Sequence, residues 1–99
     1  MYPINIIGIG QGAKDLTQKH RELINDCQIL VGGNRQLALF DYPDKQKIPI
    51  KGHIKSLIDS IKEKMNDQKI VVLASGDPLF YGIGSTLTQH IDKNHLIIH

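Results

Sequence analysis

The sequence is poor in cysteine and in aromatic residues. Its 99 residues include one cysteine, Cys27, no tryptophan, and only 5% Phe and Tyr. One cysteine excludes a disulfide framework, and a lone thiol beside an apolar run is more often a small buried side chain than a nucleophile. Because a chain without a disulfide framework is typical of a reducing compartment, we expect a cytoplasmic protein.

Long apolar runs and an excess of one charge are also lacking. No apolar segment approaches the length of a membrane span, and we expect neither a membrane segment nor a signal peptide before Ile4. The formal net charge is +2 with the two signs interspersed, which does not indicate a nucleic-acid or membrane surface. The five histidines show no metal-ligand spacing, so we expect no metal site.

What is present is an alternation of short apolar runs and helical periodicity. The chain is long enough for one domain with a single core. Apolar runs predict strands at residues 4–9, 28–32, 47–50, 69–74 and 96–98, and helical spacing predicts helices at 17–26, 34–40, 52–66 and 78–91. This order predicts an α/β fold of three layers (α/β/α), with a doubly wound, mostly parallel sheet of about five strands.

The helix ends and the edge of the sheet have sequence signals of their own. Asp15 followed three residues later by Gln18 resembles a capping box for the first helix, and Thr17 is an alternative cap. Asn34 is expected to cap the short second helix. Pro49 confines residues 47–50 to an edge strand or a coil.

Two glycine-containing turns follow predicted strands. Gly8, Gly10 and Gly12 follow the first strand, where they let the backbone approach a ligand closely. Residues 75–78 (SGDP) follow the fourth, with Asp77 and Pro78 as the cap and first residue of a helix. The carboxyl ends of parallel strands are where open α/β sheets bind ligands.

Taken alone, neither turn defines a site. The first lacks the G-x-G-x-x-G spacing of dinucleotide-binding folds, no acidic residue closes the second strand, and no Gly-Lys-Ser/Thr of a P-loop follows. It is equally well an ordinary strand-to-helix turn. An isolated Asp77 is more often a helix cap than a ligand-binding group. No Ser-His-Asp set, Cys-His set or carboxylate pair is discernible, so no catalytic residue is assigned.

Together, two stretches resemble the tetrapyrrole methylases. Residues 7–17 (IGIGQGAKDLT) resemble the amino-terminal motif of that family, and residues 74–84 (ASGDPLFYGIG) resemble its second motif, built on G-D-P. The second stretch, with residues 29–35 (ILVGGNR) upstream, is similar to the branch that methylates C-5 of the corrin ring in cobalamin biosynthesis, the precorrin-6Y or cobalt-precorrin-7 methyltransferases. The resemblance covers essentially the whole chain.

The resemblance implies an S-adenosylmethionine-dependent C-methyltransferase with two α/β domains that enclose the cofactor between them. Residues 1–99 match the amino-terminal domain, and the abrupt end of the chain after a strand suggests a fragment whose second domain is absent. Gln11 stands where the family usually has proline. The resemblance places these residues beside the cofactor: Gly10, Gln11, Gly12, Gly76, Asp77, Phe80 and Tyr81.

The same resemblance implies a corrinoid small-molecule substrate, a carboxyl-terminal domain that completes the site, and a homodimer. Within the family, a diphthine synthase or a ribosomal-RNA ribose methylase is an alternative. A non-catalytic nucleotide-binding or interaction module on the same α/β frame is an alternative of another class.

Overall fold

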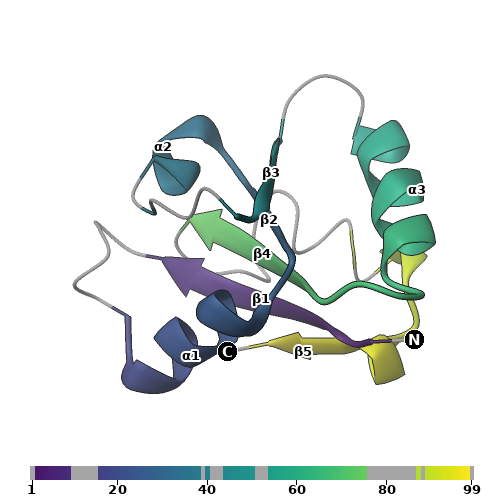
Figure 1. Cartoon of the computed structure of the whole chain (residues 1–99). Coiled ribbons are helices and arrows are strands. Elements are labelled where there is room, and N and C mark those ends of the chain that lie inside the picture. The colour runs from purple at the N-terminus through teal and green to yellow at the C-terminus, as the bar shows by residue number, and fades with distance from the viewer. Residues whose placement is uncertain are drawn as a thin grey trace.

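The fold is a five-stranded parallel sheet with helices on both faces. A computed structural model describes residues 2–9, 16–38, 40, 44–50, 54–75, 87 and 89–98. The strand order is β3-β2-β4-β1-β5, and every neighbouring pair is parallel (Figure 1). The predicted three-layer α/β architecture is therefore confirmed.

The elements lie close to their predicted positions. The strands are β1 (Ile4–Ile9), β2 (Ile29–Gly32), β3 (Gln46–Pro49), β4 (Ile70–Ser75) and β5 (Leu96–Ile98). The helices are α1 (Gln18–Asp26), α2 (Asn34–Leu37) and α3 (Ile54–Lys64), with a short 3₁₀ helix, η2 (Lys93–His95), before β5. No helix in the described segments has the length and apolar character needed to span a bilayer.

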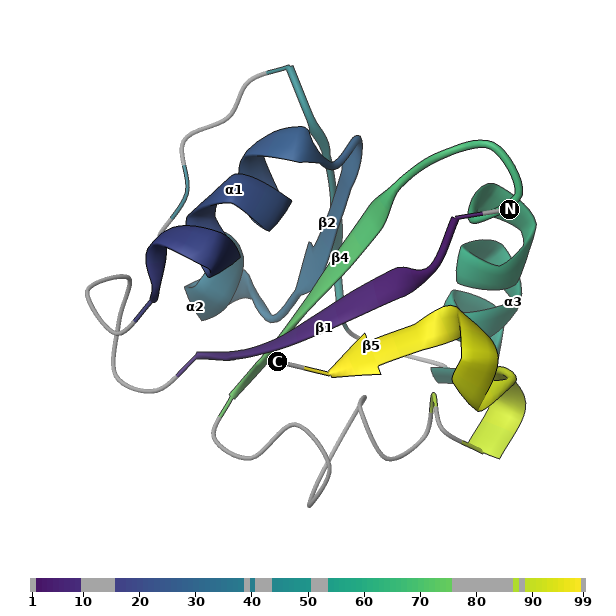
Figure 2. The same cartoon turned by 90° about the horizontal axis from the view of Figure 1, so that it is seen from below.

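Each face of the sheet carries its own core, because successive side chains of a strand point to opposite faces. Figure 2 shows α1 and α2 on one side of the sheet and α3 on the other. The α3 face buries Ile4, Ile6, Ile29, Val31, Ile70, Val72 and Ala74 against Leu57, Ile58, Ile61, Met65, Leu87 and Ile91. The α1 face buries Ile7, Leu30, Val71 and Leu73 against Leu16, Ile24, Cys27, Leu37 and Phe40.

Thr17, and not Asp15, forms the capping box of α1. The Thr17 hydroxyl accepts a hydrogen bond of 3.1 Å from the backbone N–H of His20, and His20 Nδ1 accepts one of 3.4 Å from the Thr17 N–H. Histidine here takes the part that glutamate or glutamine plays in the usual box. Gln18 instead donates from its side chain to Glu22. Asp15 lies outside the described residues.

The second helix is also capped differently from the prediction. Gly33 is the N-cap of α2 and offers no side chain, so Asn34 is the first helical residue and not the cap. The prediction for Pro49 is confirmed, because β3 is an edge strand that pairs only with β2 in the described sheet. The next residue supplies the ladder bond, with the N–H of Ile50 donating to the Gly32 carbonyl at 2.8 Å.

The predicted last helix is described only at its carboxyl end. Residues 87, 89 and 90 are helical, and the N–H of Ile91 donates to the Leu87 carbonyl at 2.9 Å. Its predicted start at Pro78 lies outside the described residues. Leu87 and Ile91 are buried on the α3 face.

Candidate functional site at the carboxyl edge of the sheet

The two strands that precede the predicted turns are neighbours at the centre of the sheet. β1 and β4 run parallel, and Gly8 pairs with Ala74 and Ile9 with Ser75. Both strands end at this last pair. The two turns, separated by more than sixty residues in sequence, therefore leave the sheet side by side at the same level.

The chain after β1 and the chain after β4 continue on opposite faces of the sheet. After β1 the chain enters α1, on the α1 face, and then joins β2. After β4 it reaches Leu87 and Ile91, on the α3 face, and then joins β5. Such a divergence between neighbouring parallel strands is a topological switch point, the position at which α/β sheets open a crevice for ligands.

A third strand ends beside this position. β4 has β1 on one side and β2 on the other. β2 ends at Gly32, and Gly33 and α2 follow it. From the sequence, Gly32 and Gly33 are predicted only to end a strand. Two consecutive glycines at the carboxyl end of a buried strand are a signal of close backbone approach that could have drawn attention to them.

The predicted site residues themselves lie outside the described residues. This holds for all seven, Gly10, Gln11, Gly12, Gly76, Asp77, Phe80 and Tyr81. The structure describes the strand ends that carry the two turns, Ile9 and Ser75, and the residues where the first turn rejoins the fold, Leu16 and Thr17.

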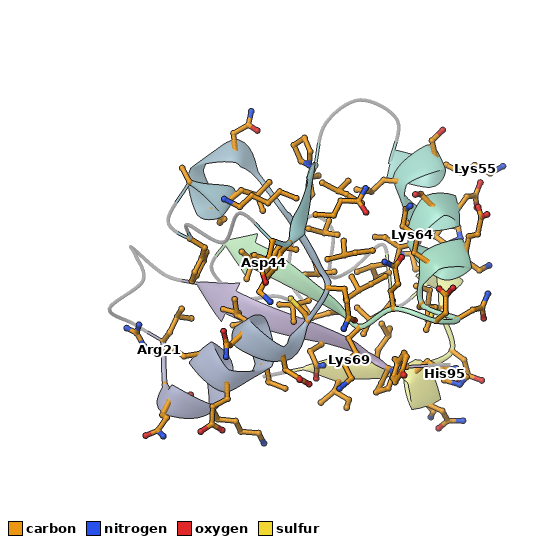
Figure 3. The ribbon with its side chains drawn as sticks, in the orientation of Figure 1. Arg21, Asp44, Lys55, Lys64, Lys69 and His95 are labelled. Carbon is orange, nitrogen blue, oxygen red and sulfur yellow. The ribbon has the colours of Figure 1, made fainter. Side chains whose placement is uncertain are left out.

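The described groups with shifted pKa values lie at the opposite, amino edge of the sheet. Asp26 and Cys27 precede β2, and Lys69 precedes β4 (Figure 3 labels Lys69). The Lys69 ammonium, 2.8 Å from Asp26 Oδ2, lowers the pKa of Asp26, and Asp26 raises the pKa of Lys69. Burial raises the pKa of the Cys27 thiol to about 11. These groups belong to the framework, at the edge of the sheet opposite the switch point.

A hollow of about 270 Å³ also lies at the amino edge. It is lined by Lys62 and Met65 from the end of α3, and by His90, Ile91, Asp92 and His95 before β5. Most of its lining is apolar. No group of three or more His, Cys, Asp or Glu side chains in the described part of the chain is arranged to hold a metal ion. Because the hollow lies at the amino edge of the sheet, it is separate from the switch point at the carboxyl edge.

Comparison with known proteins identifies relatives of this chain. Residues 3–99 match the family model of the tetrapyrrole (corrin/porphyrin) methylases. The chain is 39% identical over 88 residues to a cobalt-precorrin-7 C(5)-methyltransferase of Salmonella typhimurium, covering 88% of this chain and 43% of that protein. It is 36% identical over 91 residues to a probable cobalt-precorrin-7 C(5)-methyltransferase of Methanocaldococcus jannaschii, covering 87% and 42%.

Solved structures share the fold. A cobalt precorrin-4 methyltransferase, CbiF, superposes with a TM-score of 0.77 at 20% identity, over 96% of this chain and 44% of that one. The methyltransferase CobJ gives 0.73 at 19% identity, over 100% and 45%. The chain thus spans less than half the length of these relatives. The family model, matched over nearly the whole chain, shows that this chain belongs to the tetrapyrrole (corrin/porphyrin) methylases.

Proposed function

We propose that this chain is the amino-terminal, cofactor-binding half of an S-adenosylmethionine-dependent methyltransferase that methylates C-5 of a corrin-ring precursor in cobalamin biosynthesis. The supporting observation is the pairing of Ile9 with Ser75, from which the two motif-bearing turns leave neighbouring strands at a switch point. Relatives named as C(5)-methyltransferases of cobalt-precorrin-7 support the substrate class.

Each turn has a distinct part in this proposal. Gly10, Gln11 and Gly12 present backbone groups along one side of the cofactor. Gly76 and Asp77 line its amino-acid end, where the carboxylate attracts the positively charged groups of the cofactor. The proposal assigns Phe80 and Tyr81 to apolar surface just behind this turn.

The chemistry asks little acid–base work of the chain. The cofactor, when bound, supplies a methyl group activated on a sulfonium. The chain must hold that group in line with an electron-rich ring carbon and keep water away, and alignment of this kind lowers a barrier substantially. A site at the switch point, where the paired ends of β1 and β4 are each followed by a glycine-containing turn, suits these tasks because glycine lets the backbone approach the ligand.

The proposed enzyme extends beyond this chain. Since the relatives are more than twice as long as the matched region, we propose that a carboxyl-terminal domain forms the other wall and most of the adenine and ribose contacts. A corrinoid substrate, a homodimer and a cytoplasmic location belong to the same proposal. Residues 1–99 alone should bind the cofactor weakly or not at all.

Calorimetric titration of the complete protein with S-adenosylmethionine tests the proposal. We expect saturable binding with one cofactor per subunit. The absence of heat at high micromolar cofactor would contradict the proposal. Submicromolar binding by residues 1–99 alone would contradict the division of the site between two domains.

Substitutions at Asp77 separate a ligand-binding carboxylate from a helix cap. Asp77→Asn keeps the capping ability but removes the charge, whereas Asp77→Ala removes both, and loss of a cap costs about 1 kcal/mol. We expect both variants to lose cofactor binding. Asp92→Ala is the matched control, because the Asp92 carboxylate accepts a hydrogen bond of 3.0 Å from the Asn94 N–H in η2 at the opposite edge. Retention of full affinity by Asp77→Asn would reduce this carboxylate to a cap.

A further inference from the structure

Gly32 lies at a crowded junction of β2, β4 and α2. A Cβ built on Gly32 would lie 3.2 Å from Leu73 Cβ, 3.4 Å from the Leu73 carbonyl oxygen and 3.5 Å from Gln36 Cβ. The first contact is tighter than nine in ten real Cβ contacts, so a methyl group here requires Leu73 to shift by a few tenths of an ångström. Gly32 is itself buried.

The neighbouring glycine has different surroundings. A Cβ on Gly33 would lie 2.6 Å from Gln36 Oε1, and the next atom, Gln36 Cδ, is 3.7 Å away. This contact is with the far end of a flexible side chain, which can rotate away. Neither glycine has a φ in the left-handed region, so the backbone accepts alanine at both positions. The two positions differ in their surroundings and in their place in the fold, because Gly32 ends β2 and Gly33 is the N-cap of α2.

Leu73 cannot yield without moving its strand. Its side chain is 1% exposed and packs in the core of the α1 face. Close-packed interiors transmit such a displacement instead of absorbing it. Leu73 pairs with Ile7 across the strands, and Ser75, the last residue of β4, follows two positions later. A push at Leu73 therefore reaches the strand end from which the second turn departs.

We propose that Gly32 is a positioning residue for the cofactor crevice. The lack of a side chain lets β2 approach β4 closely, and this approach sets where β4 delivers the turn that begins at Gly76. The inference rests on the proposed function, because it assigns the position of that turn to cofactor binding. Gly32 touches no reacting group and acts only through Leu73.

The test compares Gly32→Ala with Gly33→Ala in the complete protein. A misplacement of 1 Å can lower the rate of a catalysed step by about a hundredfold, and we expect a similarly steep dependence for binding, so that a shift of a few tenths of an ångström weakens S-adenosylmethionine binding by up to about tenfold. We expect Gly33→Ala to bind like the wild type. Val31→Ala controls for stability: it removes buried methyl groups from the same strand, and should lower Tm without changing the Kd.

Two results would overturn the inference. One is an unchanged affinity of Gly32→Ala for S-adenosylmethionine. The other is an equal loss of that affinity in Gly32→Ala and Val31→Ala when the two variants have the same Tm. Amide NMR shifts of Leu73, Ala74 and Ser75 give a readout that does not need the cofactor. We expect Gly32→Ala to move these resonances and Gly33→Ala to leave them in place.

The NMR readout separates this inference from the proposed function. If the wild type fails to bind the cofactor but Gly32→Ala moves the β4 resonances, the proposed function fails while the steric effect of Gly32 on β4 stands. If the wild type binds and the β4 resonances are the same in both alanine variants, only the positioning role of Gly32 fails.

Discussion

Lys45 Nζ donates a hydrogen bond of 2.7 Å to the carbonyl oxygen of Cys27, the C-cap residue of α1. A second bond of 2.7 Å runs from the same ammonium to the Asn25 carbonyl. The last carbonyls of a helix lack partners within the helix and carry its negative dipole end. The last turn of α1 contains no basic residue of its own. A lysine from the segment before β3 thus caps this helix.

Replacing Lys45 by methionine should destabilise the fold. The substitution keeps most of the apolar stem but removes the ammonium, so two carbonyls lose a charged donor at a cost of about 1–2 kcal/mol. Urea denaturation measures the change in the free energy of unfolding. Lys55→Met, on the exposed outer side of α3, is the control and should change it by less than about 0.5 kcal/mol (Figure 3). Equal effects of the two variants would contradict the capping role.

The Cys27 thiol should be unreactive while the protein is folded. It is buried, its Sγ–H donates to the Ile24 carbonyl at 3.1 Å, and burial raises its pKa from 9.0 to about 11. Since the thiolate is the reactive form, modification by a disulfide reagent at pH 8 should be slow until urea unfolds the chain. Rapid modification of the native protein would contradict this picture.

The same shift makes a prediction about stability at alkaline pH. The pKa of Cys27 is higher in the folded state, so its contribution to stability is fully present below pH 9.0 and is lost as the pH rises toward about 11. Cys27→Ala should flatten the fall in Tm over this interval. An unchanged profile would show that other groups cause the alkaline loss.

The sequence predicts local structure well and long-range partners poorly. Strand β1 was predicted with its observed bounds because its β-branched run ends at a glycine cluster. The cap of α1 was assigned first to Asp15 because the usual box has Glu or Gln at its third helical position, and His20 is not normally read as one. The capping role of Lys45 has no local sequence signal, because its acceptors lie about twenty residues away along the chain.

The candidate site shows the same division. Each glycine-containing turn is recognisable alone, but the adjacency of Ile9 and Ser75 depends on the strand order. The connections from β1 to β2 and from β2 to β3 run in one direction across the sheet, and those from β3 to β4 and from β4 to β5 run in the other. Local sequence signals do not encode these directions. The steric role of Gly32 depends on its distance from Leu73 and is likewise not encoded in either segment alone.

The ion pair between Asp26 and Lys69 should shift the titration of Asp26 without much effect on stability. Both side chains are largely exposed, with 68% and 41% of their surface accessible, and exposed pairs contribute little. The hydrogen bond from Lys69, and then its charge, lower the pKa of Asp26 below 3.8. An NMR titration should show this, and Lys69→Met should return the midpoint toward 3.8.

The sign of that effect on stability follows from linkage. Because the pKa of Asp26 is lower in the folded state, its contribution is present above pH 3.8 and is lost as the pH falls through the folded value. Added salt should move the Asp26 midpoint upward in the wild type and much less in Lys69→Met. A midpoint that ignores both the substitution and the salt would contradict a persistent pair.

Substitutions on the two faces of the sheet should act independently. Ile61 of α3 and Ile24 of α1 are both fully buried, but they belong to separate clusters with the sheet between them. Ile61→Val and Ile24→Val should each cost about 0.5–1.5 kcal/mol, and the double variant should show their sum within about 0.5 kcal/mol. Ile61 and Ile58 lie in the same cluster, so the double variant Ile61→Val with Ile58→Val is the comparison in which the two free-energy changes need not add. Strong coupling between Ile61→Val and Ile24→Val in urea denaturation would contradict this independence and would mean that the strands transmit strain between the two cores. The test matters because Gly32 packs closely against Leu73 of the central strand β4.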